Sequence, residues 1–335
     1  MTIKEKWLAF RNSSRYEDRK GAAVKKSKNV LMTVLQIILI VGIAYIILSP
    51  VIGIVSQSFF SDADSANPMV FTIPISPTLE RYEMAIDILE YGPTMLKSML
   101  YSLTLMLLQI FTCSMVGYGF ARFNFPFKGL LFGCVVVMIV IPTHTIMLPL
   151  YMTFKTFDPL GLCTLFFGKP LSFMGSSVPM YIMTALGCGL RSGLYIYIFN
   201  QFFRGLPKEI EEAALVDGAG IWYTYFNIML RNAMPSVITV AVFSMVWQYN
   251  DTFFAKLFLI PQDQAIGLRM ASLVTNIANQ FQVYDKTIQN LYLDAGIVLM
   301  MVPIVLIYVF LQKYFIEGVE RSGLSAEIGK LRKEG

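Results

Sequence analysis

Charged side chains are scarce in this sequence. Lys, Arg, Asp and Glu make up 15% of its 335 residues, hydrophobic residues make up 56%, and the mean hydropathy is +0.59. A soluble chain carries about 25% charged residues, so the deficit excludes an ordinary soluble domain and indicates a membrane protein. The net charge of +5 comes from basic residues scattered between apolar runs, which argues against nucleic-acid binding.

Residues that build catalytic or metal centres are also scarce. The chain has one histidine, His144, and its four cysteines lie far apart without any CxxC pair: Cys113, Cys134, Cys163 and Cys188. One histidine cannot build a metal site alone, and the apolar surroundings of the cysteines predict free buried thiols. The sequence has no Walker motif, phosphate-binding glycine loop, nucleophile elbow or internal repeat. We therefore expect a chain that is not an enzyme, holds no metal or cofactor and does not itself hydrolyse ATP.

Long apolar runs, by contrast, are frequent. Residues 30–55 contain no charge, and at about 1.5 Å per residue they reach roughly 39 Å, enough to cross a hydrocarbon core of about 30 Å. The run is too long for a signal-peptide core, so we interpret it as a retained first span. Five further spans are predicted at 98–121, 129–152, 175–203, 233–259 and 291–311. The short alternating segments of a β-barrel are absent, so the sequence predicts an all-α polytopic membrane protein with six transmembrane helices.

Basic residues are distributed unevenly between the two sides of these spans. With the N-terminus inside, 19 Lys and Arg residues lie on the cytoplasmic side and 7 on the opposite side. This asymmetry predicts cytoplasmic N- and C-termini. Segment 1–29 is then a basic cytoplasmic tail, which either orients the chain or attaches to anionic membrane lipid, and 312–335 is a second cytoplasmic tail.

The extracytoplasmic side is predicted to carry the loop 56–97, and the core of the protein is predicted at 98–311. Within the loop, Thr78 is a plausible N-cap for a short helix that runs to about Glu90. The loop is large enough to meet an external partner, but it suits a solvated cap equally well.

One polar segment, 205–235, lies between two long apolar runs on the predicted cytoplasmic side. Pro207 favours a helix start, and the acids that follow suit the positive end of that helix. Asp217 and Gly218 are expected to end it. A second helix at about 221–230 is predicted to bury one apolar stripe: Trp222, Phe226 and Met229. The residues leave open whether this hairpin docks into a groove of another protein or lies on the membrane as a linker.

Polar residues inside the predicted spans are candidates for a substrate pathway. His144 lies between Pro142 and Pro149, which are expected to kink the third span, and it either binds substrate or relays a proton, or hydrogen-bonds a neighbouring helix. Arg191 must face the protein interior, where it either contacts substrate or locks helix packing beside several glycines. The end of the fifth span adds residues that line a polar vestibule or anchor the interface: Trp247, Tyr249, Asn250 and Asp251.

The polar hairpin also carries a family motif. Glu212-Ala213-Ala214, three residues, Gly218, nine residues, Ile228, one residue and Leu230 match the EAA loop of ABC importer permeases. The segments NQFFRGLPKEIEEAALVDGAG, IPTHTIMLPLY, VWQYNDTFF and QKYFIEGVERSG resemble the carbohydrate-uptake permeases, on the side of the maltose-type second permease. The resemblance covers roughly residues 30 to 323. Arg231 stands where the family usually has proline, and His144 where it more often has glutamine.

This resemblance implies a type I ABC importer permease fold in a bacterial cell membrane. The implied function is import of a sugar or oligosaccharide delivered by an extracytoplasmic binding protein. The implied partners are a paralogous permease, forming a heterodimer, and two ABC ATPase subunits that bind ATP and Mg. The implied ATPase-coupling residues are Glu211, Glu212, Ala213, Ala214, Asp217 and Gly218. The alternative is a stand-alone secondary transporter or channel, which would use internal repeats and charged pairs inside spans; only Arg191 is clearly of that kind.

Overall fold

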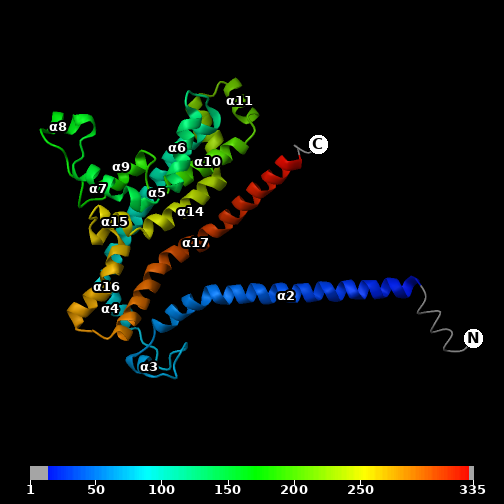
Figure 1. Ribbon diagram of the computed structural model, residues 1–335, viewed down its shortest axis with the longest axis vertical. Helices are drawn as coiled ribbons and strands as arrows, with labels where there is room; N and C mark the ends of the chain where they lie inside the picture. The colour runs from blue at the N-terminus through cyan, green and yellow to red at the C-terminus, as the bar shows by residue number, and fades with distance from the viewer. Residues whose placement is uncertain (1–13, 332–335) are drawn as a thin grey trace, which may run out of the picture.

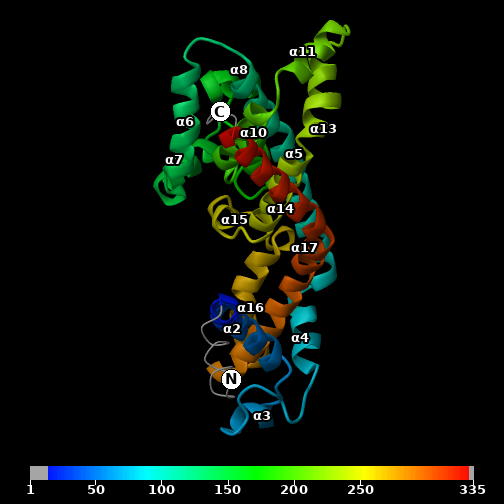
Figure 2. The same cartoon turned by 90° about the vertical axis from the view of Figure 1, so that its right-hand side faces the viewer.

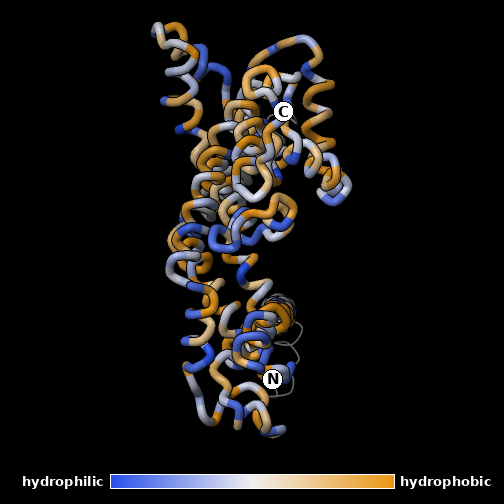
Figure 3. The backbone as a smooth tube through the Cα atoms, turned by 90° about the vertical axis from the view of Figure 1, so that its left-hand side faces the viewer, coloured by the Kyte–Doolittle hydropathy of each residue, from blue (hydrophilic) through white to orange (hydrophobic). Residues whose placement is uncertain are grey.

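The computed structural model describes residues 14–331, and every regular element in that range is a helix (Figure 1). The prediction of an all-α chain is therefore confirmed for these residues. The molecule is elongated, with α11 (Glu209–Val216) at one end and α3 (Asp62–Ala66) at the other (Figure 2). Most of the helices between these ends are rich in hydrophobic residues (Figure 3). Residues 1–13 and 332–335 of the predicted tails lie outside the described residues.

Three helices in the described part of the chain are long and apolar enough to cross a membrane. They are residues Lys28–Gln57 within α2 (Ser14–Gln57), all of α5 (Tyr91–Arg122), and Lys286–Phe310 within α17 (Lys286–Leu331). The first, second and sixth predicted spans are confirmed as helices by these elements. Both end helices are longer than predicted, because α2 starts inside the predicted N-terminal tail and α17 continues through most of the C-terminal one.

Two further predicted spans are bent. In the third, α6 (Lys128–Val140) meets the segment Thr143–Lys155 at 105°; that segment comprises η1 (Thr143–Ile146) and α7 (Met147–Lys155). The predicted kink is confirmed at Pro142, because proline cannot continue the hydrogen-bond ladder of a helix. Pro149 instead lies in the first turn of α7, where proline fits.

The fifth predicted span, 233–259, is shorter than expected. Its helix, α14 (Met234–Tyr249), is followed by a break and by the short α15 (Phe253–Leu257). At its start α14 meets the preceding helical segment Ile221–Asn232 at 76°. When each bent pair is counted as one span, up to five membrane crossings are present by length and composition in the described residues.

The fourth predicted span, 175–203, is wrong as a single helix. It consists of α9 (Val178–Ala185) and α10 (Ser192–Gly205), separated by residues 186–191. Gly187 and Arg191 have φ of +73° and +62°, in the left-handed region that a right-handed helix cannot contain. Gly193 does allow the predicted close approach, since a Cβ added there would lie 3.0 Å from the Cβ of Met138 in α6.

The amphipathic helix α16 (Ile266–Phe281) was not predicted from the sequence. Its buried side chains recur at helical spacing along one face: Ile266, Met270, Leu273 and Ile277. They pack with Leu89 of α4 (Glu80–Leu89) and Tyr292 of α17, so α4, α16 and α17 share one core cluster (Figure 1). The remaining short elements are η2 (Pro159–Gly161), α8 (Leu162–Phe167) and η4 (Gln262–Gln264).

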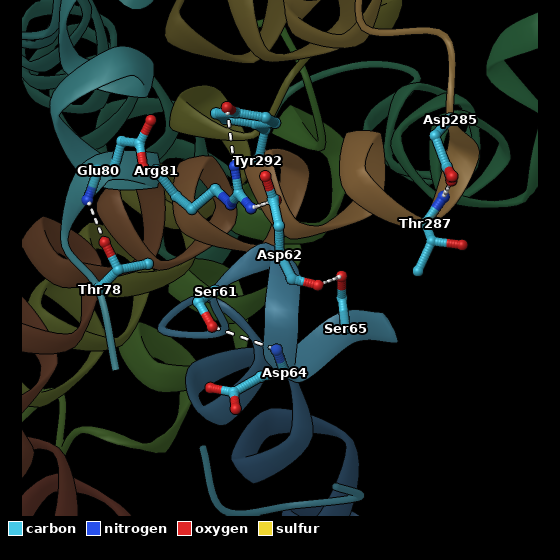
Figure 4. A network of polar contacts seen from close by, with 10 residues as sticks. All are labelled: Ser61, Asp62, Asp64, Ser65, Thr78, Glu80, Arg81, Asp285, Thr287 and Tyr292. Atoms are coloured by element: carbon cyan, nitrogen blue, oxygen red, sulfur yellow. Dashed lines mark hydrogen bonds and ion pairs between the residues drawn. The ribbon is translucent and has the colours of Figure 1, made fainter. Parts of the chain in front are cut away.

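A polar network fastens the predicted loop 56–97 to this cluster (Figure 4). The buried guanidinium of Arg81 in α4 pairs with Asp62 of α3 and donates a hydrogen bond to the Tyr292 hydroxyl at 2.8 Å. Helix α4 starts where predicted, but its N-cap position is Leu79 and not Thr78, whose Oγ1 accepts a hydrogen bond from the Glu80 backbone N–H at 3.2 Å. The loop is therefore a folded element held against α17.

Helices α5 and α10 approach each other closely at Gly117. A Cβ added to Gly117 would lie 2.6 Å from the Cβ of Phe199 and 3.0 Å from the backbone nitrogen of Asn200, whereas Gly119 has open space around it. We expect Gly117→Ala to lower the stability of the fold by about 1–3 kcal/mol through overpacking, and Gly119→Ala to leave it nearly unchanged. Thermal unfolding of the two variants in detergent measures this difference, and equal melting temperatures would contradict the close contact.

Candidate functional site

The predicted hairpin 205–235 forms one end of the molecule (Figure 2). Helix α11 follows Pro207 and carries three acids in its first turn, where the positive helix end favours them. The second helical segment consists of α12 (Ile221–Tyr223), the π-helical turn η3 (Thr224–Met229) and α13 (Leu230–Asn232). The predicted helix-turn-helix is confirmed, and with arginine at position 231 the second segment continues to Asn232.

Gly218 makes the sharp turn that ends α11. Its φ is +84°, and its N–H donates to the Leu215 carbonyl at 3.1 Å while the next N–H, of Ala219, donates to the Ala214 carbonyl at 3.0 Å. These two bonds form a Schellman motif, in which a left-handed residue closes the helix and satisfies its last carbonyls. Glycine suits this position because it has no Cβ to oppose the left-handed conformation.

The six residues implied in ATPase coupling divide between two faces of α11 and its turn. Four of them are exposed: Glu212, Ala213, Asp217 and Gly218. Glu211 and Ala214 instead face the body of the molecule, where Ala214 is buried. In the described residues Glu212 makes no ion pair, so its carboxylate is available to a partner.

Glu211 is tied to the end of α5. Its Oε2 lies 3.2 Å from Arg122 Nε, and its Oε1 accepts a hydrogen bond from the Tyr118 hydroxyl at 2.5 Å. The Arg122 side chain is 5% exposed and that of Glu211 is 16% exposed, so the ion pair is largely shielded from water. Arg122 Nη2 also donates to the Leu206 carbonyl at 3.0 Å, just before α11 begins.

The second helical segment buries a different face from the predicted one. Thr224, Tyr225 and Met229 are buried, while Trp222 is 64% and Phe226 40% exposed. The π-helical turn rotates the side chains relative to an ideal α-helix, which an α-helical pattern does not anticipate. The hairpin therefore carries five exposed apolar residues: Leu215, Val216, Ile221, Trp222 and Tyr223. Several exposed apolar side chains on one short hairpin are typical of a segment that contacts a protein or a membrane.

Two of the predicted pathway residues lie together at the break before α10. The guanidinium carbon of Arg191 lies 4.9 Å from the ring centroid of Trp247, in a cation–π contact. The Trp247 ring also stacks on Tyr195 and Phe243, at 6.1 and 5.7 Å between centroids. Arg191 is thus held over an aromatic stack contributed by α10 and α14.

The other pathway candidates are engaged elsewhere. The Tyr249 hydroxyl donates to the Met300 carbonyl of α17 at 2.9 Å, and Asp251 Oδ1 accepts from the Phe254 N–H at 3.3 Å. The Asp251 Oδ2 is buried and has no hydrogen-bond partner. The exposed Asn250 donates to the Val246 carbonyl of its own helix. His144 contacts the edge of Phe253, with ring centroids 4.7 Å apart.

A buried glutamine at the same break was missed by sequence reasoning. Gln109 Nε2 of α5 donates to the Leu190 carbonyl at 2.6 Å and to Ser192 Oγ at 3.0 Å. Its Oε1 accepts from Ser244 Oγ at 2.7 Å and from Gln248 Nε2 at 3.3 Å. The network satisfies a carbonyl that the broken helix sets free and joins α5 and α14 to the break. A lone glutamine in the charge-free run 98–121 was the available signal.

The described residues contain no group of three or more His, Cys, Asp or Glu side chains placed to hold a metal ion. All four cysteines are free thiols. Cys113 and Cys163 are buried as predicted, but Cys134 and Cys188 are exposed. In the part of the chain that the structure describes, the site offers hydrogen-bonding groups, aromatic faces and one guanidinium.

Residues 110–321 match the family described as binding-protein-dependent transport system inner membrane component. The matched segment includes the hairpin, the break before α10 with Arg191, and the residues of α10 and α14 that bond to Gln109, which itself lies one position before the match. This chain belongs to that family. The permease is accordingly a multi-pass inner-membrane subunit of an ABC importer.

Several relatives of the permease have named functions. It is 26% identical to the diacetylchitobiose uptake system permease protein of Streptomyces coelicolor over 88% of this chain and 86% of that protein. It is 25% identical to an arabinooligosaccharides transport system permease protein of Halalkalibacterium halodurans, over 90% and 99%. It is 28% identical to the melibiose/raffinose/stachyose import permease protein of Bacillus subtilis, over 79% and 87%.

The fold of the permease resembles that of a solved importer. A chain of a bacterial ABC transporter involved in the import of the acidic polysaccharide alginate matches with a TM-score of 0.65 and 18% identity. The match covers 86% of this chain and 98% of that one. The predicted importer permease fold is confirmed, and nothing in the family match supports a stand-alone secondary transporter or channel.

Proposed function

We propose that the permease imports a sugar or oligosaccharide, with transport driven by ATPase subunits that dock on its polar hairpin. The observation that carries this proposal is the exposure of acidic and apolar side chains on the outer face of α11. Glu212 and Ala213 are exposed there, beside exposed apolar residues such as Val216, which is 86% exposed. An acidic and apolar surface on a folded projection suits a groove that is lined by basic and apolar residues.

The family implies that an ATPase and a binding protein act with the permease. In the proposed complex the permease pairs with a related permease, and each docks one of two ATPase subunits, which bind ATP and Mg. The permease itself contributes no cofactor. Helix α2 supports a second membrane partner, since in its most apolar window no side chain is buried inside the chain. Lipid covers whatever the partner leaves exposed.

The proposed orientation counts the broken pair α9 and α10 as a sixth crossing and places α11 and both termini in the cytoplasm. The excess of 19 over 7 basic residues on that side supports it. The folded loop 56–97 then lies outside the membrane, at the opposite end of the molecule from α11 (Figure 2), where it is accessible to an external binding protein.

The sugar class rests on the named relatives and is supported by polar groups near Arg191. Gln248 Oε1 and the Tyr195 hydroxyl are buried without hydrogen-bond partners; the Tyr195 ring stacks on Trp247, and the Gln248 amide bonds to Gln109 at the break. Buried polar groups normally find partners, and sugar hydroxyls would supply them during passage. We propose that Arg191 and Trp247 line the pathway, with His144, Tyr249, Asn250 and Asp251 as outer candidates.

Removing the Arg191 guanidinium is expected to weaken the interaction of the permease with its substrate without affecting ATPase docking. Arg191→Met keeps the apolar stem, and loss of one charged hydrogen-bond donor costs about 1.5–3 kcal/mol, so the KM for uptake should rise roughly tenfold or more. Arg204→Met, an exposed position at the end of α10, is the matched control. Uptake kinetics in vesicles measure both, and an unchanged KM for Arg191→Met would remove Arg191 from the pathway.

Co-purification tests the proposed complex directly. The permease is tagged at its C-terminus, expressed with its chromosomal neighbours and purified in mild detergent. We expect a second permease to elute with it in an equal amount, together with two ABC ATPase subunits for each pair of permeases. A permease that purifies without any ATPase would contradict the proposal.

A further inference from the structure

Helix α11 is joined to the rest of the molecule through few side chains. Its outer residues are free for a partner, and on its inner side Ala214 is buried and Glu211 is largely covered. Among the ion pairs of the described residues, the one that involves α11 is Glu211 with Arg122. A displacement of α11 by a docked protein reaches the rest of the molecule through Glu211, through the packing of α11 and its buried Ala214 against η3, or through the flanking chain.

Arg122 holds α11 at two points. It pairs with the Glu211 carboxylate inside the helix, and it donates to the carbonyls of Leu206 and Pro207 in the segment that leads into the helix, at 3.0 and 3.5 Å. Arg122 is also the last residue of α5, where a cation complements the negative end of the helix. One side chain thus fixes both the position and the entry of α11.

Tyr118 connects the same carboxylate to the aromatic core. It lies one turn before Arg122 on the same face of α5, and its hydroxyl donates to Glu211. Its ring contacts Phe203 of α10 and Tyr225 of the second hairpin segment, with centroids 5.3 and 5.1 Å apart. Displacement of Glu211 would therefore disturb three helical elements together.

Helix α5 continues from this point to the centre of the molecule. Gln109 lies 13 residues before Arg122, roughly 20 Å along the helix axis, and its amide holds the break beside Arg191. Helix α5 is continuous between the two positions and contacts both α10 and α14 (Figure 1). It links the hairpin to the proposed pathway.

We propose that Glu211, clamped by Arg122 and Tyr118, is a positioning residue that makes α5 follow α11 when the ATPases close. This inference rests on the proposed function and assigns Glu211 a role different from that of Glu212. Glu212 faces the ATPase, whereas Glu211 faces the permease. We call the contacts of Glu211 with Arg122 and Tyr118 the clamp. Loss of the clamp leaves the exposed face of α11 in place for the ATPase, but it disconnects α11 from α5, the helix that reaches the pathway.

The test uses the whole complex in lipid nanodiscs with its binding protein. Glu211→Gln and Arg122→Gln are each expected to co-purify the ATPase at the wild-type level while ATP hydrolysis stimulated by loaded binding protein falls about tenfold, a typical size for coupling between sites. Since both variants break one unit, Glu211→Gln/Arg122→Gln should lose no more than either alone. Tyr118→Phe, which keeps the packed ring, should give a smaller loss.

Glu209→Gln is the matched control, because Glu209 is an exposed acid of the same helix without an ion pair in the described residues. Glu209→Gln should co-purify the ATPase and show stimulated ATP hydrolysis at the wild-type level. Full stimulation in Glu211→Gln and Tyr118→Phe, or losses that multiply in the double variant, would overturn the clamp. If Glu211→Gln or Arg122→Gln loses the ATPase or melts early, Tyr118→Phe decides the outcome. A wild-type permease that binds no ATPase would instead overturn the proposed function.

Discussion

Glu212→Lys is expected to abolish ATPase docking and uptake. Glu212 is exposed on the outer face of α11 and makes no ion pair in the described residues, so its charge is free to meet a basic partner. Reversing the charge replaces an attraction with a like-charge contact, which costs several kcal/mol. A loss of about 4 kcal/mol weakens the complex roughly a thousandfold. Pull-down of the ATPase by the tagged permease measures docking, and substrate uptake by whole cells measures transport.

Glu209→Lys is the matched comparison for this prediction. It makes the same charge change in the same helical turn, at another exposed position. If Glu212 is the docking residue, Glu209→Lys should keep most of the ATPase and most of the uptake. Normal uptake by Glu212→Lys would remove Glu212 from docking. Equal losses from both variants would show that net charge, and not this contact, governs docking.

Gly218→Val is expected to uncouple ATP hydrolysis from transport. The Gly218 φ of +84° is a conformation that a β-branched residue resists at a cost of about 1–3 kcal/mol. A Cβ at this position has open space, so the strain is in the backbone alone. We expect the turn to rearrange, the angle between α11 and α12 to change, and binding-protein-stimulated ATP hydrolysis to fall about tenfold.

Gly220→Val separates this strain from the effect of bulk. Gly220 also has open space around it, but its φ is −71°, which valine adopts readily. Gly218→Asn adds a further comparison, because asparagine tolerates the left-handed region. The expected order of stimulated hydrolysis is wild type, Gly220→Val, Gly218→Asn and then Gly218→Val. Normal stimulation in Gly218→Val would remove the turn from the coupling mechanism.

The parts of the molecule that follow from local chemistry were predictable from the sequence. Pro207 and the acids after it mark the start of α11, and Gly218 marks its end. Pro142 predicts the bend after α6, and the residues from Thr78 to Arg81 predict the start of α4, although its N-cap is Leu79. In each case the cause lies within a few residues of the effect, so one sequence is enough to locate it.

The parts that depend on distant contacts were not predictable. Residues 186–191 contain no proline, and the apolar run across them looks continuous. The break is held by Gln109, which lies about 80 positions earlier in the chain and supplies a hydrogen bond to the freed Leu190 carbonyl. The inward orientation of Glu211 similarly depends on Arg122 and Tyr118. The π-helical turn departs from the α-helical period and was not predictable from it, whereas α16 has apolar residues at helical spacing that sequence reasoning overlooked.

Uptake by reconstituted proteoliposomes tests the proposed importer most directly. The permease is inserted with its partner permease and ATPases, the binding protein is supplied outside with labelled oligosaccharide, and MgATP is enclosed inside. We expect uptake that requires MgATP, the binding protein and the ATPases together, and that Glu212→Lys eliminates. Uptake by the permease alone, driven by an ion gradient without ATP, would contradict the proposed function.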